Sequence, residues 1–565
     1  MGYFNEFPWT NFHGFNLDWI LKTVKDSETK VNAFSENLSN LVIEEIEKIQ
    51  GSIAVNVMFP PPPLKGAKGD YDTNQTDDIE ALQAIHDYLV LRGGGVMYFP
   101  LGVYGISEPF ILDSNITIVG ETMNGVTIKA MPTFTGTAVI KNKDFDSLTG
   151  QNYWFVSEGV KYGFAIKDIT IDGNTQIVKG TQLYAKGFFI DRLRIANCNA
   201  GGWYSECGYK GGQSEIADMP ESIIGGVYIY DCTGYGMDYL GPHDGYIREV
   251  FISGLNKSGT KGMRLLIQPN VYSGGCELGH LHLYGLGSEG FYANTKFLGD
   301  SVISENVDLT PFVLDATHCQ LSRFENYGGV NDGETIMKIN GSQNHIASVD
   351  IRYRDTTTNA TGIDITGNEN FVKGTVYGLN TNGKGCKING RGNNADLNIY
   401  DFNASGGVGF DFNDNDNARE NRIVLNLRNC DTAIVSNSTG SAVNVMDIRG
   451  YSNATLISGE FGLRDEIRGG LADDSGVTKY FQDFLTAIGE IDLTIDTAQD
   501  ITINHNLVYI PNFRKTTVTL YDINVDNVGF DYIRLKSVSA TNVIVTVKLS
   551  TVGTGTGSVL VNASI

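Results

Sequence analysis

The 565-residue sequence predicts a mainly β protein whose central part is a parallel β-helix. An apolar tetrad recurs every 21 to 28 residues between Gly236 and Val435. Its second and fourth positions are apolar or aromatic and flank a mixed third position, which is typical of a strand with one buried face. The chain holds 67 Gly, 13 Pro and 19% charged residues. This composition excludes collagen and a charged coiled coil.

The third positions of the nine tetrads define one outward column, and Lys338 is the exception among the fourth positions. Stacked once per coil, the third-position side chains lie about 4.8 Å apart. Asparagines that precede strands predict a second, hydrogen-bonded column, and the repeat extends over about 12 to 14 coils. The third positions are Asp238, Arg264, Tyr292, Val313, Met337, Asp364, Lys387, Asp411 and Ile434, and the asparagines are Asn344, Asn370, Asn394 and Asn421.

Charge and cysteine content exclude several classes of protein. The net charge of −23 disfavours binding to nucleic acid, because phosphate backbones would be repelled. No apolar run reaches the roughly 18 residues of a membrane span, and no secretory signal is visible at the N-terminus. The seven cysteines include no CxxC pair, so we expect reduced, mostly buried thiols and synthesis in a cytoplasm.

The N-terminal segment 1–57 is predicted to be a helical arm. Residues 17–50 carry apolar side chains at steps of three, four or seven, which is a broken heptad pattern. The segment either oligomerises or packs on its own domain. Pro60–Pro63 forms a stiff linker that favours oligomerisation, since it separates the helix from the rest.

Residues 58–110 are predicted to be a linker and a cap. Thr76 or Asp77 begins a helix, the glycines at 93–95 end it, and Val96–Phe99 forms a strand. This stretch resembles the opening of pectate-lyase-like right-handed β-helix proteins, "GD…TDD…A(I/L)Q…GG…V(Y)FP.G.Y". The resemblance implies a right-handed β-helix over 111–470, a helix that covers its core, and a structural role for Asp77 and Asp78.

Residues 471–565 read as six short alternating strands, which predicts an antiparallel β-sandwich. The piece 503–511 is similar to a strand and turn in lectin-like terminal domains of phage tail proteins. That similarity implies trimerisation or glycan binding. The alternative is a plain cap on the last coil.

The order of arm, linker, β-helix and sandwich resembles bacteriophage tailspikes and tail appendages. The resemblance implies a homotrimeric virion protein whose arm binds phage tail or collar proteins. It also implies binding of a host surface polysaccharide or wall teichoic acid during adsorption, with depolymerisation by a glycosidase or lyase. The alternative is a non-enzymatic adhesin or structural tail fibre, since the polygalacturonase-type catalytic signature is absent. The host, the polymer and the reaction are not readable from the sequence.

The candidate site combines the outward column with the segments around it. Asp238 and Asp244 or Glu289 are the predicted acid–base pair, and Arg264 positions an acidic sugar. A surface salt-bridge ladder is the alternative, as Asp364, Lys387 and Asp411 illustrate. A long insertion spans 197–224, and the site can also lie between subunits. The expected substrate-binding residues are Trp203, Tyr204, His243 and Tyr292.

No cofactor is expected, and no metal site is assigned. Calcium is an open alternative at the acidic run 411–420, although that run lacks the glycine of a calcium loop and also fits a coil turn. His280 and His282 alternate along one strand and are expected to be polar wall residues, because a third ligand is not evident.

Overall fold

The structure, a computed structural model, describes most of the chain from Ala54 to Glu460 and separate strands beyond it. The described residues are 54–148, 161–206, 222–242, 244–267, 275–328, 330–353, 359–412, 418–437, 444–460, 466–473, 478–481, 487–493, 499–504, 516–524, 530–538, 542–549 and 555–563. The predicted helix at 17–50 lies outside these residues. Among the described residues, no helix has the length and apolarity needed to cross a membrane.

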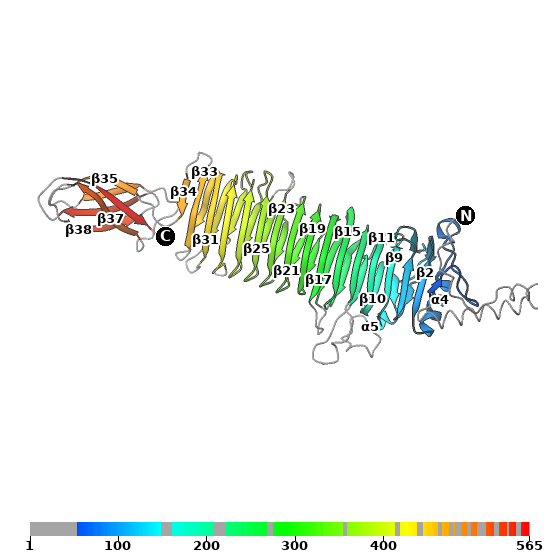
Figure 1. Cartoon of the computed structure of the whole chain (residues 1–565). Helices are drawn as coiled ribbons and strands as arrows, with labels where there is room; N and C mark the ends of the chain where they lie inside the picture. Colours follow the sequence, from blue (N-terminus) through cyan, green and yellow to red (C-terminus); the bar gives the residue numbers. More distant parts are fainter. Residues whose placement is uncertain are drawn as a thin grey trace, which may run out of the picture.

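Two sheets, parallel except for the antiparallel strand β34 (Thr478–Phe481), form the walls of a right-handed β-helix of about 13 turns, which confirms the predicted fold class (Figure 1). The long sheet contains β1 (Ala54–Asn56), β2 (Gly95–Phe99), β3 (Gly102–Ile106), β5 (Ile116–Gly120), β6 (Val126–Ala130), β9 (Ala165–Asp172), β11 (Phe189–Ala196), β13 (Ile223–Tyr230), β15 (Tyr246–Ser258), β17 (Cys276–Gly287), β19 (Phe297–Glu305), β21 (Gln320–Tyr327), β23 (His345–Arg352), β25 (Phe371–Tyr377), β27 (Asn394–Tyr400), β29 (Arg422–Arg428), β31 (Val445–Asn453), β33 (Glu466–Asp473) and β34 (Thr478–Phe481). The short sheet contains β4 (Phe110–Leu112), β7 (Ala138–Asn142), β8 (Lys161–Tyr162), β10 (Lys179–Lys186), β12 (Trp203–Glu206), β14 (Gly234–Leu240), β16 (Thr260–Leu266), β18 (Phe291–Ala293), β20 (Phe312–Leu314), β22 (Thr335–Ile339), β24 (Thr361–Ile365), β26 (Lys384–Ile388), β28 (Val408–Phe412), β30 (Thr432–Asn437) and β32 (Thr455–Glu460).

The tetrad column coincides with the strand register of the short sheet, with two corrections. Val313 pairs with Lys338 rather than Met337, and Asp411 pairs with Val435 rather than Ile434. Met337 and Ile434 are both fully buried. Each of these two strands has consecutive buried apolar residues, so the sequence pattern fits equally well one residue away. Lys338 is thus an ordinary outward residue and no exception.

The asparagine ladder exists, but its third member is Asn393 and not Asn394. Asn344, Asn370 and Asn393 are each 1% exposed. The Asn393 Oδ1 accepts the backbone N–H of Asn370 at 2.9 Å, and the Asn393 N–H donates to Asn421 Oδ1 at 2.8 Å. Each coil therefore fixes its neighbour through buried amide hydrogen bonds, which are costly to leave unpaired.

The interior is one continuous apolar cluster from Val55 to Leu471. Six cysteines lie in or beside this core as free, buried thiols, as the sequence predicts: Cys198, Cys232, Cys276, Cys319, Cys386 and Cys430. For Cys386, burial raises the pKa well above its usual value. These thiols therefore pack as small hydrophobes.

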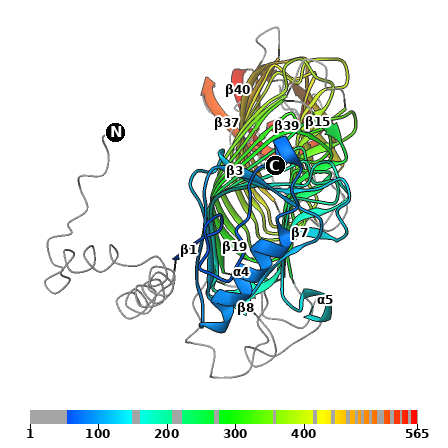
Figure 2. The ribbon, with the colours of Figure 1, turned by 90° about the vertical axis from the view of Figure 1, so that its right-hand side faces the viewer.

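Helix α4 (Ile79–Leu91) crosses the N-terminal end of the core and covers it (Figure 2). It follows the short helix α3 (Tyr71–Asn74), and another short helix, α5 (Phe145–Leu148), follows β7. Helix α4 begins after Asp78, but Asp78 makes no side-chain cap bond, and the Asp77 carboxylate accepts the Ile79 N–H at 3.2 Å, so the capping role expected of Asp77 is confirmed. The Asp78 carboxylate accepts the backbone N–H groups of Lys68 and Gly69 at 2.6 and 3.0 Å and so ties the linker to the cap.

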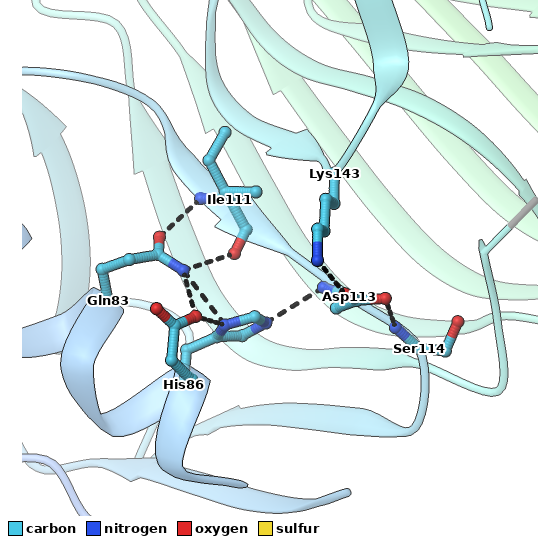
Figure 3. Close-up of polar contacts among 7 residues, drawn as sticks. Gln83, His86, Ile111, Asp113, Ser114 and Lys143 are labelled. Atoms are coloured by element: carbon cyan, nitrogen blue, oxygen red, sulfur yellow. Dashed lines mark hydrogen bonds and ion pairs between the residues drawn. The ribbon is translucent and has the colours of Figure 1, made fainter. Parts of the chain in front are cut away.

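Polar side chains fasten α4 to the first coils (Figure 3). Gln83 exchanges two hydrogen bonds with the backbone of Ile111, at 3.0 and 3.2 Å. His86 is 2% exposed, and its Nε2 accepts the Asp113 N–H at 3.0 Å. Burial lowers the pKa of His86, which keeps the ring neutral.

The six predicted C-terminal strands are present as two three-stranded antiparallel sheets. They are β35 (Ala487–Leu493), β36 (Gln499–Asn504), β37 (Thr516–Asn524), β38 (Phe530–Val538), β39 (Asn542–Leu549) and β40 (Gly555–Ala563). The packing of these sheets as a sandwich stays a prediction.

Candidate functional site

Four predicted site residues lie in one outward column on the short sheet. Tyr204 pairs with Asp238, Asp238 with Arg264, and Arg264 with Tyr292. These residues come from β12, β14, β16 and β18, which are successive strands of the sheet. The stacking that the repeat predicts for Asp238, Arg264 and Tyr292 is therefore confirmed, at about 4.8 Å per step, and Tyr204 extends the column by one strand.

Asp238 and Arg264 form a bidentate ion pair. The Arg264 Nε and Nη2 donate to the two Asp238 carboxylate oxygens, each at 2.6 Å. The Asp238 side chain is 6% exposed and that of Arg264 is 32% exposed. Since a guanidinium carries five N–H bonds, the pair leaves Arg264 with donors for another anion.

Glu289 joins this pair through Tyr235 and Lys261. The Tyr235 hydroxyl donates to Glu289 Oε2 at 2.7 Å, and Lys261 Nζ donates to the same oxygen at 3.1 Å. The guanidinium carbon of Arg264 lies 4.1 Å from the centroid of the Tyr235 ring. We call Tyr235, Asp238, Lys261, Arg264 and Glu289 the Asp238 cluster.

The protonation states in the Asp238 cluster follow from these contacts. Partial burial opposes ionisation of Glu289, but hydrogen bonds from Tyr235 and Lys261 outweigh it and lower the pKa of Glu289. Burial and the hydrogen bond to Glu289 raise the pKa of Tyr235 to about 12. Near neutral pH, Glu289 is therefore a carboxylate and Tyr235 a neutral phenol.

Two tyrosines flank the cluster along the column. The Tyr292 hydroxyl donates to Asp315 Oδ2 at 2.7 Å, and burial together with this contact raises the pKa of Tyr292 to about 12. The Tyr204 hydroxyl donates to Glu206 at 2.6 Å, and Lys179 Nζ lies 4.8 Å from the Tyr204 ring centroid. A tyrosine ring thus extends the column on each side of the cluster, and a cation, Lys179, lies on the Tyr204 side.

The other predicted site residues do not join the cluster in the same way. Trp203 is 1% exposed and packs in the core, so its expected role of stacking on a sugar is wrong. Its place next to a long insertion suggests an accessible ring, but strand alternation turns Trp203 inward. Asp244 lies in the turn between β14 and β15, beside Gly275. His243 and insertion residues 207–221 lie outside the described residues.

The sequence pattern did not identify Tyr235 and Lys261. They pair with each other, three residues before Asp238 and Arg264. The buried Gly236 and Gly262 lie between these outward positions, so strict alternation does not apply. A repeated aromatic or basic residue directly before the tetrad glycine is the signal that would have found them.

The long sheet carries a second group of titratable side chains. His280 and His282 both lie on β17, with ring centroids 6.3 Å apart, and His282 Nε2 is 3.3 Å from Glu305 Oε1. Burial and His282 lower the pKa of His280. Among the described residues, no group of three or more potential ligands has the arrangement of a metal site. The expected wall role of these histidines stays a prediction.

The acidic run at 411–420 is only partly described, because residues 413–417 lie outside the described part of the chain. Asp411 is 4% exposed and forms an ion pair with Lys384. The calcium alternative stays untested.

Residues 65–199 match the family model described as rhamnogalacturonase A/epimerase, pectate lyase-like. Alginate lyase 7 of Azotobacter vinelandii is 32% identical over 124 residues, 20% of this chain and 13% of that protein. Mannuronan C5-epimerase AlgE3 of the same organism is 31% identical over 186 residues, 32% of this chain and 8% of that protein. The chain therefore spans only about a tenth of the length of these relatives.

Two solved structures are similar to this chain at low sequence identity. The tailspike of Escherichia coli bacteriophage HK620, solved with a hexasaccharide, is 12% identical, with 91% of this chain and 93% of that chain covered and a TM-score of 0.41. The AlgE4 A-module, from an A. vinelandii mannuronan C-5 epimerase, is 15% identical, with 72% and 98% covered and a TM-score of 0.34. Residues 65–199 thus match a pectate lyase-like family model at the start of a right-handed parallel β-helix.

Proposed function

We propose that this chain is a phage tail appendage that binds a host surface polysaccharide and cleaves it. The Asp238 cluster is the observation that carries the proposal. It places two carboxylates, two partly exposed cations and one neutral phenol on successive coils of one wall. A flat wall of this kind suits an extended polymer, and the pectate lyase-like match supports the same class of substrate.

The protonation states favour a lyase over a glycosidase. A glycosidase needs a carboxylic acid whose pKa is raised, so that it can protonate the leaving oxygen. Glu289 has the opposite shift, since its pKa is lowered. An ionised carboxylate beside cations suits abstraction of a proton next to a sugar carboxylate. The relative named alginate lyase supports this choice of reaction.

In the proposed reaction, Arg264 and Lys261 bind the carboxylate of a uronate unit and stabilise the negative charge that develops on it. Glu289 takes the proton from the adjacent ring carbon. The electron pair of that C–H bond forms a C=C bond, the glycosidic C–O bond breaks, and the leaving oxygen takes a proton from water. Asp238 contacts only Arg264 in this scheme and is a positioning residue.

The remaining parts of the proposal concern the assembly. The N-terminal arm would attach the protein to phage tail or collar proteins, and three copies would associate. A non-enzymatic adhesin is the second candidate, because Asp238 is fully engaged by Arg264, as in a structural salt bridge. In that case the same wall binds the polymer and leaves it intact.

The test incubates the full chain with alginate, polygalacturonate, hyaluronan and wall teichoic acid. Lyase action yields unsaturated uronate absorbance and new reducing ends in equal amounts. Reducing ends without the absorbance identify a hydrolase and contradict the elimination. Co-sedimentation with a polymer and no product identifies an adhesin. No binding and no product on any of these polymers, or on capsule from candidate hosts, contradicts the proposal.

A further inference from the structure

The outer face of the long sheet carries a file of tyrosines and arginines. Paired positions on eight successive strands, from β17 to β31, form this file, which is about 34 Å long at about 4.8 Å per step. We call it the tyrosine–arginine file. It consists of Tyr284, Glu305, Tyr327, Arg352, Tyr377, Tyr400, Arg428 and Tyr451.

The C-terminal part of the file is an accessible aromatic surface. Tyr377 and Tyr451 are 36% and 49% exposed. The rings of Tyr377 and Tyr400 meet edge to face, with centroids 5.3 Å apart. The Arg428 guanidinium lies 5.0 Å from the Tyr451 ring centroid. These contacts order the side chains before any ligand arrives, which lowers the entropic cost of binding.

A hollow of about 350 Å³ lies directly beside this part of the file. Its lining residues come from β27, β29 and β31 and include Asn398, Asn426 and Arg449. The Asn426 Nδ2 lies 3.3 Å from Asn398 Oδ1 and 3.4 Å from the Tyr400 hydroxyl, so the amides join the hollow to the file. Its volume lies at the lower end of the range of small-molecule sites.

The charges around the hollow favour an anion. Asp396 also lines it, and this carboxylate is paired with Lys373 at 2.8 Å. Asp447 lies 3.9 Å from Arg449. Arg428 is exposed, and no carboxylate of the described residues lies within ion-pair distance of it. On a chain with a net charge of −23, an uncompensated arginine stacked on a tyrosine marks a place for a negative group.

We propose that this hollow binds a carboxylated sugar unit, as an anchoring site separate from the Asp238 cluster. The tyrosine rings cover the apolar face of the sugar, the asparagines bind its hydroxyl groups, and Arg428 binds its carboxylate. A second copy of this chain is a poorer occupant, because permanent interfaces are largely apolar, whereas amides and charges line this surface. The inference rests on the ligand class of the proposed function, an acidic polysaccharide, and it requires no cleavage.

The test measures the affinity of a mannuronate trisaccharide, a galacturonate trisaccharide and neutral mannotriose by calorimetry. The full chain carries Asp238→Asn, so that cleavage does not interfere. The inference predicts that an acidic trisaccharide binds and mannotriose binds at least about tenfold more weakly. Arg428→Gln and Tyr400→Ala each weaken the acidic ligand by about tenfold. Arg352→Gln is the matched control, because Arg352 belongs to the same file but is paired with Asp350. The affinity of the Arg352→Gln variant for the acidic trisaccharide stays unchanged.

Four results would overturn the inference: no binding of either acidic trisaccharide, equal binding of mannotriose, equal effects of the two arginine changes, or unchanged affinity in Arg428→Gln and Tyr400→Ala. Light scattering measures the oligomeric state and so tests whether a second copy of this chain occupies the surface instead. If these variants change the oligomeric state and leave ligand affinity intact, the surface is an interface between copies. If the wild type cleaves a polymer and any of these results is also obtained, the proposed function still holds and only the anchoring site is excluded.

Discussion

The two walls of the β-helix use the same coil register for different purposes. On the short sheet, the outward column at β14 and β16 brings opposite charges together, and Asp238 and Arg264 bind each other. On the long sheet, the column from β25 to β31 brings together rings and an arginine without a nearby carboxylate. Both columns stack side chains at about 4.8 Å. The identity of the stacked residues decides whether the wall fixes its charges or presents them to solvent.

This difference separates positioning from anchoring. A charge that is locked by its neighbour has a fixed direction, which suits the positioning of a substrate. Rings and an unpaired cation on an open sheet suit a polymer that slides and rebinds. If the proposed function and the proposed anchoring site both hold, the short sheet performs the chemistry and the long sheet captures the polymer, and the following predictions can break that division.

The largest expected effect is the loss of polymer cleavage in the Asp238→Asn variant. The change removes the anion that orients Arg264, and misplacement of a binding group costs about 100-fold in rate. Asp364→Asn is the matched control, because Asp364 lies in the same column and faces Lys387 at 3.8 Å. Product formation on the cleaved polymer is measured for both variants. Equal cleavage rates in the Asp238→Asn variant and the wild type would show that the short sheet does not take part in the reaction.

A large effect on stability is expected from Asn393→Ala. The change removes the side-chain partner of the Asn370 N–H and of the Gly367 carbonyl, both on the preceding coil, and lowers the free energy of unfolding by about 3 kcal/mol. Thermal unfolding followed by circular dichroism measures this change. The ladder adjoins β27 and lies far along the chain from β14. Binding of the acidic trisaccharide on the long sheet should therefore weaken in Asn393→Ala, while cleavage by the folded protein persists. Loss of cleavage with unchanged binding would contradict the separation of the two walls.

A moderate effect is expected on the pH dependence of cleavage in Tyr235→Phe. The Tyr235 hydroxyl stabilises the Glu289 carboxylate, so its removal raises the pKa of Glu289. The acid limb of the rate profile should then move to higher pH, because Glu289 must be ionised to accept a proton. The profile of kcat/KM against pH measures the shift. An unmoved acid limb would show that Glu289 is not the base.

The smallest effect is expected at the cap, which supports both walls alike. The folded-state pKa of His86 is lowered by burial from 6.5, so the unfolded state binds more protons as the pH falls. Stability from this residue is present above pH 6.5 and decreases below it. The midpoint of thermal unfolding should fall from pH 7 to pH 5 in the wild type and fall less in His86→Gln. Parallel declines in both proteins would exclude His86 as the cause.

The sequence repeat predicted the column that joins Asp238, Arg264 and Tyr292, because one outward residue per coil follows from strand alternation. It misplaced Met337 and Asn394 by one residue, since neighbouring residues fit the pattern equally well. The repeat did not predict Tyr235 and Lys261, because a buried glycine follows each of them and interrupts the alternation of inward and outward residues.

The file on the long sheet was not predicted at all. Its members lie near the ends of long strands, such as Tyr327 and Arg428, where no glycine tetrad marks the register. Only the pairing of strands in three dimensions places these residues in one line.

Steady-state cleavage by Arg428→Gln tests the separation of the two walls most directly. On the polymer that the wild type cleaves, an anchoring role predicts that KM rises about tenfold while kcat stays within about twofold, because the residue binds polymer without touching the reacting bond. A fall in kcat with KM unchanged would place Arg428 in the reaction and contradict the account.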